Sequence, residues 1–372
     1  MLSSNEGEAV KQTDIVIVGA GFAGASTAYH LSRSFSGSIL IIEKEEIPGF
    51  HASGRNAALV LQSTQHPDIR QVIVSSTQAY AQYRDEIGFE QHGSMLLGTR
   101  ENLETLLQPE LVKAEFQDPE QVRREIPLLK DRDFPAALFT PSDGIMDISA
   151  LLQFYLAGSR SNGVDLWLNC ELTEISSGKN LRLQTSQGTV ETSLLINAAG
   201  AWATQVANLA GAYDLPMTPY KRHLFILDQI PEIDPTWPFV WDFLENFYFR
   251  PESGGLLFSI CDEEKSQSLE PKVSPDISQS LAELVWVSLP SLRQATQRDV
   301  WSCFRTKTPD DSFLIGWDSC VDNFFWVAGL GGHGMGCSWE IGRRAASLLL
   351  DRESRQENPF DPNRFARKND NN

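Results

Sequence analysis

The clearest chemical signal in the sequence is a glycine-rich segment, G-A-G-F-A-G, at residues 19–24. Gly19 permits a tight turn, Gly21 lets the backbone approach a pyrophosphate, and Gly24 allows a helix to pack closely. The N-terminus of that helix offers free N–H groups and the positive end of its dipole to phosphate. Glu43 ends the next predicted strand and would accept hydrogen bonds from ribose hydroxyls. The pattern predicts a dinucleotide site, but spacing alone does not separate FAD from NAD.

The elements around this segment have the order that a dinucleotide site requires. Residues 14–19 (DIVIVG) are an apolar, β-branched run typical of a buried parallel strand. Residues 22–34 carry small residues on the helical face that must approach a sheet, and residues 38–43 (SILIIE) form a second buried strand. Strand, tight turn, helix and strand together predict a βαβ unit.

The rest of the chain mixes helical periodicity with short alternating strands. Helices are expected at 67–87, 101–114, 148–160 (introduced by Asp147), 276–289 and 334–350. Strands are expected at 93–98, 136–140, 164–169, 171–175, 181–185, 189–192, 193–198, 223–228, 246–251, 255–260, 299–305, 312–317 and 324–329. The strands between 215 and 305 are typical of an antiparallel sheet.

The predicted fold class is therefore α/β, with a Rossmann-like βαβ domain interleaved with an α+β domain built on an antiparallel sheet. Two domains are expected because 372 residues exceed the size at which single cores usually split. We assign 13–90, 145–215 and 298–350 to the discontinuous cofactor domain, 91–144 and 216–297 to the substrate domain, and 1–12 and 351–372 to flexible or peripheral termini.

Composition narrows the classes of partner. A formal net charge of -18 repels phosphate backbones, so nucleic acid is not expected as a partner. The five cysteines are far apart without a CxxC pair, which argues against a disulfide framework, a zinc site or any other metal site. The N-terminus lacks a secretory signal pattern and no apolar run is long enough to span a bilayer. A cytoplasmic protein without an integral membrane segment is expected, with peripheral membrane contact left open.

Four segments together resemble a known family. They are the glycine motif at 19–24, HASGRNAA at 51–58, INAAGAW at 196–202 and FWVAGLGGHGM at 325–335. In this order they resemble the D-amino-acid-oxidase-like (DAO) FAD-dependent oxidoreductases, which include glycine and sarcosine oxidases and bacterial D-amino-acid dehydrogenases. The resemblance covers about residues 13–350 and is strongest to the D-arginine dehydrogenase type. It implies that the dinucleotide is FAD.

The resemblance also implies which residues hold FAD. Segment 53–57 would follow the phosphates and the flavin ring, Leu172 would contact the adenine end, and segment 199–200 would lie under the ribose and pyrophosphate. A surface ion pair for Arg55 and a plain turn for Gly200 remain the alternatives. The FAD-binding residues implied are Gly19, Gly21, Phe22, Ala23, Gly24, Glu43, Lys44, Ser53, Arg55, Asn56, Ala57, Leu172, Ala199, Gly200, Trp202, Cys303, Gly331, Gly332, His333, Gly334 and Met335.

Two of these assignments carry open alternatives. The glycines of 331–335 precede the last predicted helix, whose N-terminus could stabilise the anionic reduced flavin, while the ring of His333 is either catalytic or a bystander. Cys303 lies in a segment similar to the one in sarcosine-oxidase-like enzymes where a cysteine bonds covalently to flavin. Free cysteine is also a common core residue, so a covalent and a non-covalent cofactor both remain possible readings.

An amino-acid substrate brings a carboxylate, for which a guanidinium is the natural partner. The resemblance implies that Arg305 and Tyr248 hold this carboxylate, with Arg222 at a further substrate-side position and His51 either tuning the flavin site or packing. The reaction implied is hydride transfer from the substrate Cα to flavin N5, which gives an imine that water hydrolyses to a 2-oxo acid and ammonia. No protein general base is required if the amine is neutral.

Several alternatives stay open on the sequence. The substrate is expected to be a small D-amino or imino acid, but a glycine/sarcosine-type oxidase, a 2-hydroxy-acid dehydrogenase or a non-catalytic flavin-binding subunit would share the same motifs. The electron acceptor is either oxygen or a quinone or electron-transfer partner. Glu90 is the one acid we nominate against a cationic side chain, which leaves that specificity unsupported. The aromatic residues Trp237, Trp241, Phe243 and Phe247 could line an apolar pocket or belong to the core.

Overall fold

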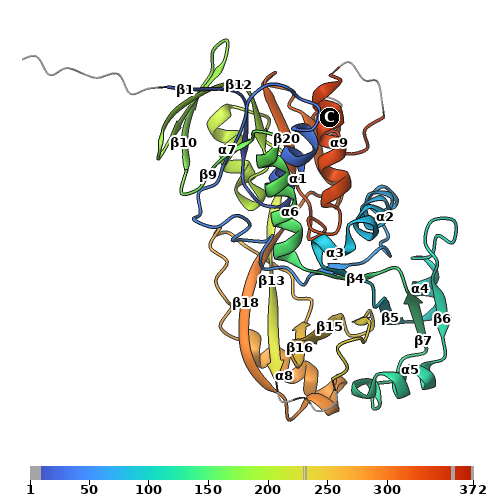
Figure 1. The fold of residues 1–372 in the computed structure, drawn as a ribbon. Coiled ribbons are helices and arrows are strands. Elements are labelled where there is room, and N and C mark those ends of the chain that lie inside the picture. The colour runs from blue at the N-terminus through green and yellow to red at the C-terminus, as the bar shows by residue number, and fades with distance from the viewer. Residues whose placement is uncertain (1–9, 229, 231–232, 353–356, 370–372) are drawn as a thin grey trace, which may run out of the picture.

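The computed structural model describes residues 10–228, 230, 233–352 and 357–369, and these form two halves stacked on one another (Figure 1). The upper half contains the N-terminal strand and helix together with the last long helix, and the lower half contains a second, mostly antiparallel sheet. Chain segments from both ends of the sequence therefore meet in the upper half. The segments predicted as termini that fall on 1–9, 353–356 and 370–372 lie outside the described residues.

The upper sheet has a parallel centre that the apolar runs explain. β1 (Lys11–Val18) pairs in parallel with β2 (Ile39–Ile42) on one side and with β12 (Gly188–Asn197) on the other. Parallel strands covered on both faces need apolar residues throughout, and all four side chains of β2 are buried. The remaining strands are β9 (Asp165–Trp167), β10 (Leu172–Ser176), β11 (Leu181–Thr185), β19 (Leu314–Trp317) and β20 (Phe324–Ala328).

Three helices pack together against this sheet. α1 (Phe22–Leu31) contacts both α6 (Ile148–Ser161) and α9 (Ser338–Leu350), and it approaches α9 closely because small residues face each other there. A Cβ on Gly342 of α9 would lie 2.4 Å from the backbone oxygen of Ser26 in α1. The predicted helix at 148–160 is confirmed, and its expected cap is present because Asp147 Oδ1 accepts from the N–H of Ala150 at 2.9 Å.

The lower sheet forms the wall on which side chains can face the upper half. Its strands run in the order β17-β13-β16-β15-β14-β5-β7-β6, with β18 (Thr296–Lys307) pairing along the other edge of β13 (Thr218–Asp228). One face packs on α8 (Ile277–Ser288) through an aromatic core, and the opposite face points toward the glycine motif. The other strands are β5 (Ser94–Gly98), β6 (Glu115–Gln117), β7 (Ala136–Thr140), β14 (Phe239–Asp242), β15 (Phe247–Glu252), β16 (Gly255–Ser259) and β17 (Glu264–Lys265).

A small three-stranded sheet joins the two halves, and short helices complete the fold. The small sheet contains β3 (Leu59–Val60), β8 (Gly144–Met146) and β4 (Phe89–Glu90), and all of these residues except Gly144 fall in the predicted cofactor domain. The remaining helices are α2 (Pro67–Gln82), α3 (Arg84–Ile87), α4 (Arg100–Glu104), α5 (Pro119–Glu125), α7 (Ala203–Ala210) and α10 (Asn363–Asn369), with short 3-10 turns at Pro127–Leu129, Gly200–Trp202 and Pro290–Leu292.

Several parts of the chain differ from the sequence-based expectation. The helix predicted at 101–114 ends at Glu104, and the helix predicted from residue 334 begins only at Ser338. β1 starts three residues earlier than predicted because Lys11 already pairs with Val190. Within the predicted peripheral tail, Phe360 is fully buried against Phe313, with ring centroids 5.2 Å apart. The earlier start of β1 and the burial of Phe360 come from contacts between segments that are far apart in the sequence.

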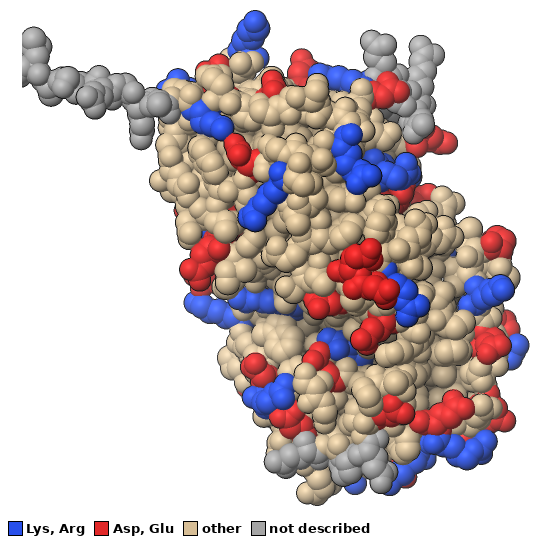
Figure 2. All heavy atoms as spheres, in the orientation of Figure 1, with Lys and Arg blue, Asp and Glu red and all other residues tan. Residues whose placement is uncertain are grey.

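The strand β18 does not pair within the domain to which residues 298–350 were assigned. Most of β18 lies in that range, yet this strand pairs with β13 of the lower sheet along its whole length. The domain boundaries otherwise stay predictions. On the face shown in Figure 2, acidic and basic side chains are interspersed over both halves.

One buried hydroxyl links α2 to the segment that leads into α9. Tyr80 donates to the carbonyl of Met335 at 2.8 Å and contacts the hydroxyl of Ser338 at 2.8 Å. We expect Tyr80→Phe to lower the free energy of unfolding by about 1–3 kcal/mol, because it leaves these buried groups unsatisfied. Chemical denaturation measures this. Tyr83→Phe is the matched control, since no hydrogen bond of its hydroxyl is found among the described residues, and equal losses in both variants would contradict the prediction.

Candidate functional site

The glycine motif forms a narrow turn at the N-terminus of α1. Gly19 has a φ of +106°, which side chains rarely tolerate, and a Cβ there would lie 2.6 Å from the carbonyl oxygen of Ala198 at the end of β12. The N–H of Ala20 donates to the carboxylate of Glu43 at 2.9 Å, so the acid at the end of β2 also fixes the turn. The backbone is thereby held open for a ligand at the helix N-terminus.

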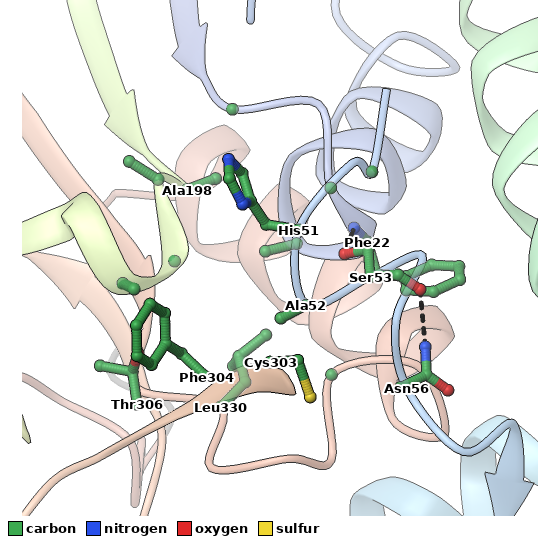
Figure 3. Close-up of a pocket in the computed structure, with 18 of the residues that line it drawn as sticks. Phe22, His51, Ala52, Ser53, Asn56, Ala198, Cys303, Phe304, Thr306 and Leu330 are labelled. Carbon is green, nitrogen blue, oxygen red and sulfur yellow. Dashed lines mark hydrogen bonds between the residues drawn. The ribbon is translucent and has the colours of Figure 1, made fainter. Parts of the chain in front are cut away.

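A serine from a distant segment completes this turn. Ser53 Oγ accepts from the N–H of Phe22, the first residue of α1, at 3.0 Å. A Cβ on Gly21 would lie 2.7 Å from the same oxygen. Asn56 in turn donates from its side chain to the carbonyl of Ser53 at 2.6 Å, which is the dashed line in Figure 3. The predicted segment 53–57 therefore lies directly at the N-terminus of α1.

Charged and aromatic groups gather beside the end of β2. The ammonium of Lys44 lies 3.6 Å from the ring centroid of Trp202, and the ring of His51 lies 4.3 Å from the same tryptophan. His51 Nε2 is 2.7 Å from a carboxylate oxygen of Glu45. Burial lowers the pKa of His51, an effect that the hydrogen bond to Glu45 opposes. His51 is therefore positioned by its neighbours, and its role toward the flavin stays a prediction.

The second glycine segment turns just before α9. Gly331 and Gly332 have φ values of +55° and +96°, and a Cβ on Gly332 would lie 2.9 Å from Nε of Arg305. Because α9 begins at Ser338, residues 331–335 form turns ahead of the helix rather than its first residues. No hydrogen bond from the N–H of Gly332 or Gly334 is found among the described residues, so both donors are available to a ligand.

His333 lies among these turns and lines the same space. Burial, followed by the charges of Arg305 and Lys307, lowers the pKa of His333 to about 4. The imidazole is therefore neutral near neutral pH and adds no positive charge to the site. Its catalytic role stays a prediction.

The lower sheet presents its candidate substrate residues on one face. Antiparallel partners share a face, and Arg222 of β13 is opposite Cys303 of β18, with Arg305 two residues further along. Tyr248 of β15 is on the same face and fully buried, and burial raises the pKa of its hydroxyl while the charge of Arg305 opposes this. The hydroxyl of Tyr248 is thus a neutral donor at physiological pH.

The two arginines lack full partners. Arg222 is buried, with one contact of 3.4 Å from Nη2 to Glu263, and its Nε and Nη1 have no partner among the described residues. No ion pair or hydrogen bond of the Arg305 side chain is found among the described residues either. The unpaired donors of buried Arg222 are costly, and the half-buried guanidinium of Arg305 lines the same cavity, so an anionic ligand at this place would be stabilised.

These parts surround one cavity of about 570 Å³ that runs from the glycine motif to the lower sheet. Gly24 and Arg55 do not line it. Gly24 instead lies against the backbone of Gly19, and Arg55 stacks over Phe50 with 4.7 Å to the ring centroid. The predicted site residues that line the cavity are Gly19, Gly21, Phe22, Ala23, Glu43, Lys44, His51, Ser53, Asn56, Ala57, Leu172, Ala199, Gly200, Trp202, Arg222, Tyr248, Cys303, Arg305, Gly331, Gly332, His333, Gly334 and Met335.

The sequence did not indicate the apolar wall of this cavity. Leu59, Leu61, Ile73 and Leu224 line it without any motif that could have marked them, because only the three-dimensional pairing brings them there. Among the four aromatic residues left open, Trp241 lines the cavity, and this is the outcome that the pocket alternative predicted.

The other three aromatic residues and the nominated acid lie elsewhere. Trp237 and Phe247 belong to the core on the opposite face of the lower sheet, and Phe243 is exposed at the end of β14. Glu90 is exposed in β4 and does not line the cavity. The candidate acid for a cationic substrate is therefore not in the site.

Comparison with known proteins identifies the family. The family model described as "DAO: FAD dependent oxidoreductase" matches residues 14–348. The chain belongs to the DAO family of FAD-dependent oxidoreductases. Dimethylglycine dehydrogenase of Rattus norvegicus is 26% identical over 96% of this chain, and the pyruvate dehydrogenase phosphatase regulatory subunit of Mus musculus is 24% identical over 91%. The chain spans less than half the length of either relative, 45% and 41% respectively.

Solved structures of this family share the fold. L-proline dehydrogenase from P. horikoshii superposes with a TM-score of 0.86 at 23% identity, over 97% of this chain and 99% of that chain. Glycine oxidase from Geobacillus kaustophilus gives a TM-score of 0.80 at 21% identity, over 95% and 98%. The predicted combination of a parallel FAD-binding sheet with a largely antiparallel second sheet is confirmed.

FAD, the cofactor of this DAO family, fits the residues that are present. The cradle at Gly19 and Gly21 has no room for a Cβ, the start of α1 offers N–H groups, and Gly332 and Gly334 have free donors at the far end of the cavity. In the described part of the chain, no helix is long and apolar enough to cross a membrane, and no group of three His, Cys, Asp or Glu side chains could hold a metal ion.

The cradle generates a direct test. Because a Cβ at residue 21 would collide with Ser53 Oγ and reduce the space beside the helix N-terminus, we expect Gly21→Ala to weaken FAD binding by about tenfold or more. The ratio of flavin to protein absorbance in the purified protein measures this. Gly178→Ala, in the exposed turn between β10 and β11, is the matched control. Full flavin content in the Gly21 variant would show that the turn does not hold the pyrophosphate.

Cys303 generates a second test. Its thiol lines the cavity (Figure 3), but burial raises its pKa and so reduces the thiolate that would attack the flavin. We therefore expect acid precipitation to release the yellow colour into the supernatant, and Cys303→Ser to retain FAD. Colour that stays in the wild-type pellet and is lost from the Cys303→Ser pellet would instead establish a covalent link.

Proposed function

We propose that the protein oxidises a small amino or imino acid at the carbon–nitrogen bond beside its carboxylate, with FAD as the electron acceptor of the first half-reaction. The observation that carries this proposal is Arg305, a guanidinium that lines the cavity and has no carboxylate partner among the described residues. The names of the relatives agree with it, since they include dimethylglycine dehydrogenase, L-proline dehydrogenase and glycine oxidase.

The arrangement of donors supports a carboxylate anchor. A guanidinium binds a carboxylate through two parallel hydrogen bonds, and a neutral tyrosine hydroxyl can donate a third. Arg305 and Tyr248 both line the cavity, and the charge of Arg305 acts on the tyrosine hydroxyl. Arg222 adds a second cation from the neighbouring strand. An anionic group bound here would satisfy donors that otherwise remain unpaired.

The same charges favour a substrate amine without its extra proton. The acidic residues that line the cavity are Glu43 and Glu171, which lie at the end of β2 and just before β10, far along the chain and the cavity from Arg305. The guanidinium of Arg305, which has no ion pair among the described residues, lowers the pKa of an ammonium group bound beside it, and Arg222 adds to this effect although its Nη2 contacts Glu263 at 3.4 Å. A neutral amine can release its Cα hydride without a general base, and bound FAD supplies the acceptor for that hydride at flavin N5. The protein's task is then to orient the substrate and exclude water.

The finer identity of the substrate remains part of the proposal. We place small D-amino acids and imino acids first, which would give an imine that hydrolyses to a 2-oxo acid and ammonia. A sarcosine- or glycine-type oxidase and a 2-hydroxy-acid dehydrogenase use the same carboxylate anchor. A cytoplasmic location and the choice between oxygen and another electron acceptor are likewise proposals.

One comparison favours a second candidate from another class. The mouse relative that is named a regulatory subunit matches 91% of this chain, so a flavin-binding subunit without turnover is the alternative. The two functions differ in one observable. An enzyme is bleached anaerobically by its substrate, whereas a non-catalytic subunit keeps the spectrum of oxidised flavin with every compound.

The proposal is tested by recording the visible spectrum anaerobically with a panel of D- and L-amino acids, glycine, sarcosine, N,N-dimethylglycine, proline and 2-hydroxy acids. We expect an amino or imino acid to bleach the flavin. Arg305→Ala should weaken the binding of this substrate by about a hundredfold or more, because the carboxylate loses its charged partner. Arg305→Lys should recover only part of the loss, since an ammonium cannot bind a carboxylate through a planar fork.

Arg298→Ala is the matched control for this test. Arg298 lies on the same strand, is half exposed and pairs with Asp228 at 3.2 Å, away from the cavity. It should leave substrate affinity unchanged. If Arg305→Ala and the wild type are bleached at the same substrate concentration, Arg305 does not bind the substrate carboxylate. If no compound of the panel bleaches the flavin, the non-catalytic alternative is favoured.

A further inference from the structure

The end of the cavity beside Tyr248 is closed by a tryptophan that no motif marks. Trp241 of β14 is opposite Tyr248 of β15, so both side chains are on the same face of the lower sheet. Their ring centroids are 4.9 Å apart, and both line the cavity. A ligand whose carboxylate is held between Arg305 and the hydroxyl of Tyr248 would therefore direct its other substituents toward the indole ring.

Trp241 is held firmly in this position. The exposed ring of Phe243 stacks on it, with centroids 5.7 Å apart and ring planes 6° from parallel. The intervening Asp242 is fully buried, accepts from Arg132 Nε at 2.7 Å and caps the following turn through the N–H of Leu244 at 2.8 Å. Moving the backbone of β14 at this position would disturb the ion pair and the turn of Asp242, so these contacts keep the strand in place beside the cavity.

The other walls at this end are apolar. Leu59, Leu61 and Ile73 reach the cavity from the small sheet and α2, and Leu224 reaches it from β13. No acidic residue lines this end among the described residues, since Glu43 and Glu171 lie toward β2 and β10. A cationic substituent would therefore lose its hydration without gaining a partner, whereas a small apolar one would be stabilised by burial.

We propose that Trp241 is the residue that sets substrate size in this cavity, and that it restricts the substrate to amino or imino acids with a compact, uncharged substituent. The proposal rests on the carboxylate anchor of the proposed function. It does not require turnover, because a carboxylate that cannot be oxidised would meet the same wall. It excludes arginine- and lysine-like substrates, which the D-arginine dehydrogenase type would have suggested.

Simple carboxylates of increasing size test this on the FAD-loaded protein. Acetate, cyclopentanecarboxylate and 1-naphthoate are titrated, and the dissociation constant is read from the perturbed flavin spectrum. In the wild type we expect 1-naphthoate to bind more weakly than cyclopentanecarboxylate. Trp241→Val should tighten 1-naphthoate by about tenfold or more and change acetate by less than about threefold, since only the larger ligand reaches the wall.

Trp241→Phe is the matched variant that keeps an aromatic wall. Its indole Nε1 is buried without a hydrogen-bond partner among the described residues, so phenylalanine removes no hydrogen bond. It should retain most of the wild-type discrimination, which keeps the proposal testable if Trp241→Val does not fold. Three outcomes would each overturn the proposal. The ratio of the dissociation constants of 1-naphthoate and acetate could be unchanged in Trp241→Val, Trp241→Phe could lose as much discrimination as Trp241→Val, or the wild type could bind no carboxylate.

The outcome separates this proposal from the proposed function. If carboxylates bind with the expected size dependence but no amino or imino acid bleaches the flavin, the oxidation is wrong and the role of Trp241 stands. If small amino acids bleach the flavin and lysine or arginine do so equally well, the oxidation stands and the restriction set by Trp241 is wrong.

Discussion

The close approach of three chain segments at Gly19 is the constraint on which the rest of the structure depends. β1 ends there between β2 and β12, with no room for a Cβ against the carbonyl of Ala198. The same turn starts α1, and Gly24 must be a glycine because a Cβ would lie 2.0 Å from the oxygen of Gly19. The helix N-terminus, the acid that ends β2 and the segment after β12 therefore converge on one point, which is where a dinucleotide phosphate finds its donors.

The second half of the molecule is built so that one sheet face looks back at this point. Alternation along β13, β15 and β18 divides their side chains between an aromatic core on one face and the cavity on the other. A shift of register by one residue would turn Arg222 and Arg305 toward the core and His223 toward the cavity. The long pairing of β13 with β18 therefore also determines which side chains line the cavity. Position in the sheet, rather than a local motif, decides which side chains meet the substrate.

This distinction explains how much the sequence could predict. The βαβ unit and the helix at 148–160 follow from local patterns and were predicted, because the turn and the helix cap require particular residue types at fixed spacing. FAD, in contrast, was predicted from the resemblance of four segments to the DAO family. The burial of Phe360 depends on a distant partner, Phe313, and was not predicted. The early end of the helix predicted at 101–114 has a local cause that was overlooked, because Pro109 cannot continue a helix. In the cavity the glycines were recognised, whereas Leu59, Leu61 and Leu224 were not, because apolar residues carry no signal that separates a cavity wall from a core. For Arg55 the resemblance implied an FAD contact, which stays a prediction, and its side chain stacks on Phe50.

The charge of the cavity runs against the charge of the chain. The protein has a formal net charge of -18, which repels anions at long range, yet Arg222 and Arg305 line the end of the cavity that lacks acidic residues. Salt screens exposed charges beyond about 8–10 Å, so an anionic substrate near the mouth responds mainly to the nearest groups. Selection for a carboxylate therefore follows from two local cations rather than from the field of the whole protein. The buried Nε and Nη1 of Arg222 lack hydrogen-bond partners in the empty site, so an anion that binds them would stabilise the folded protein.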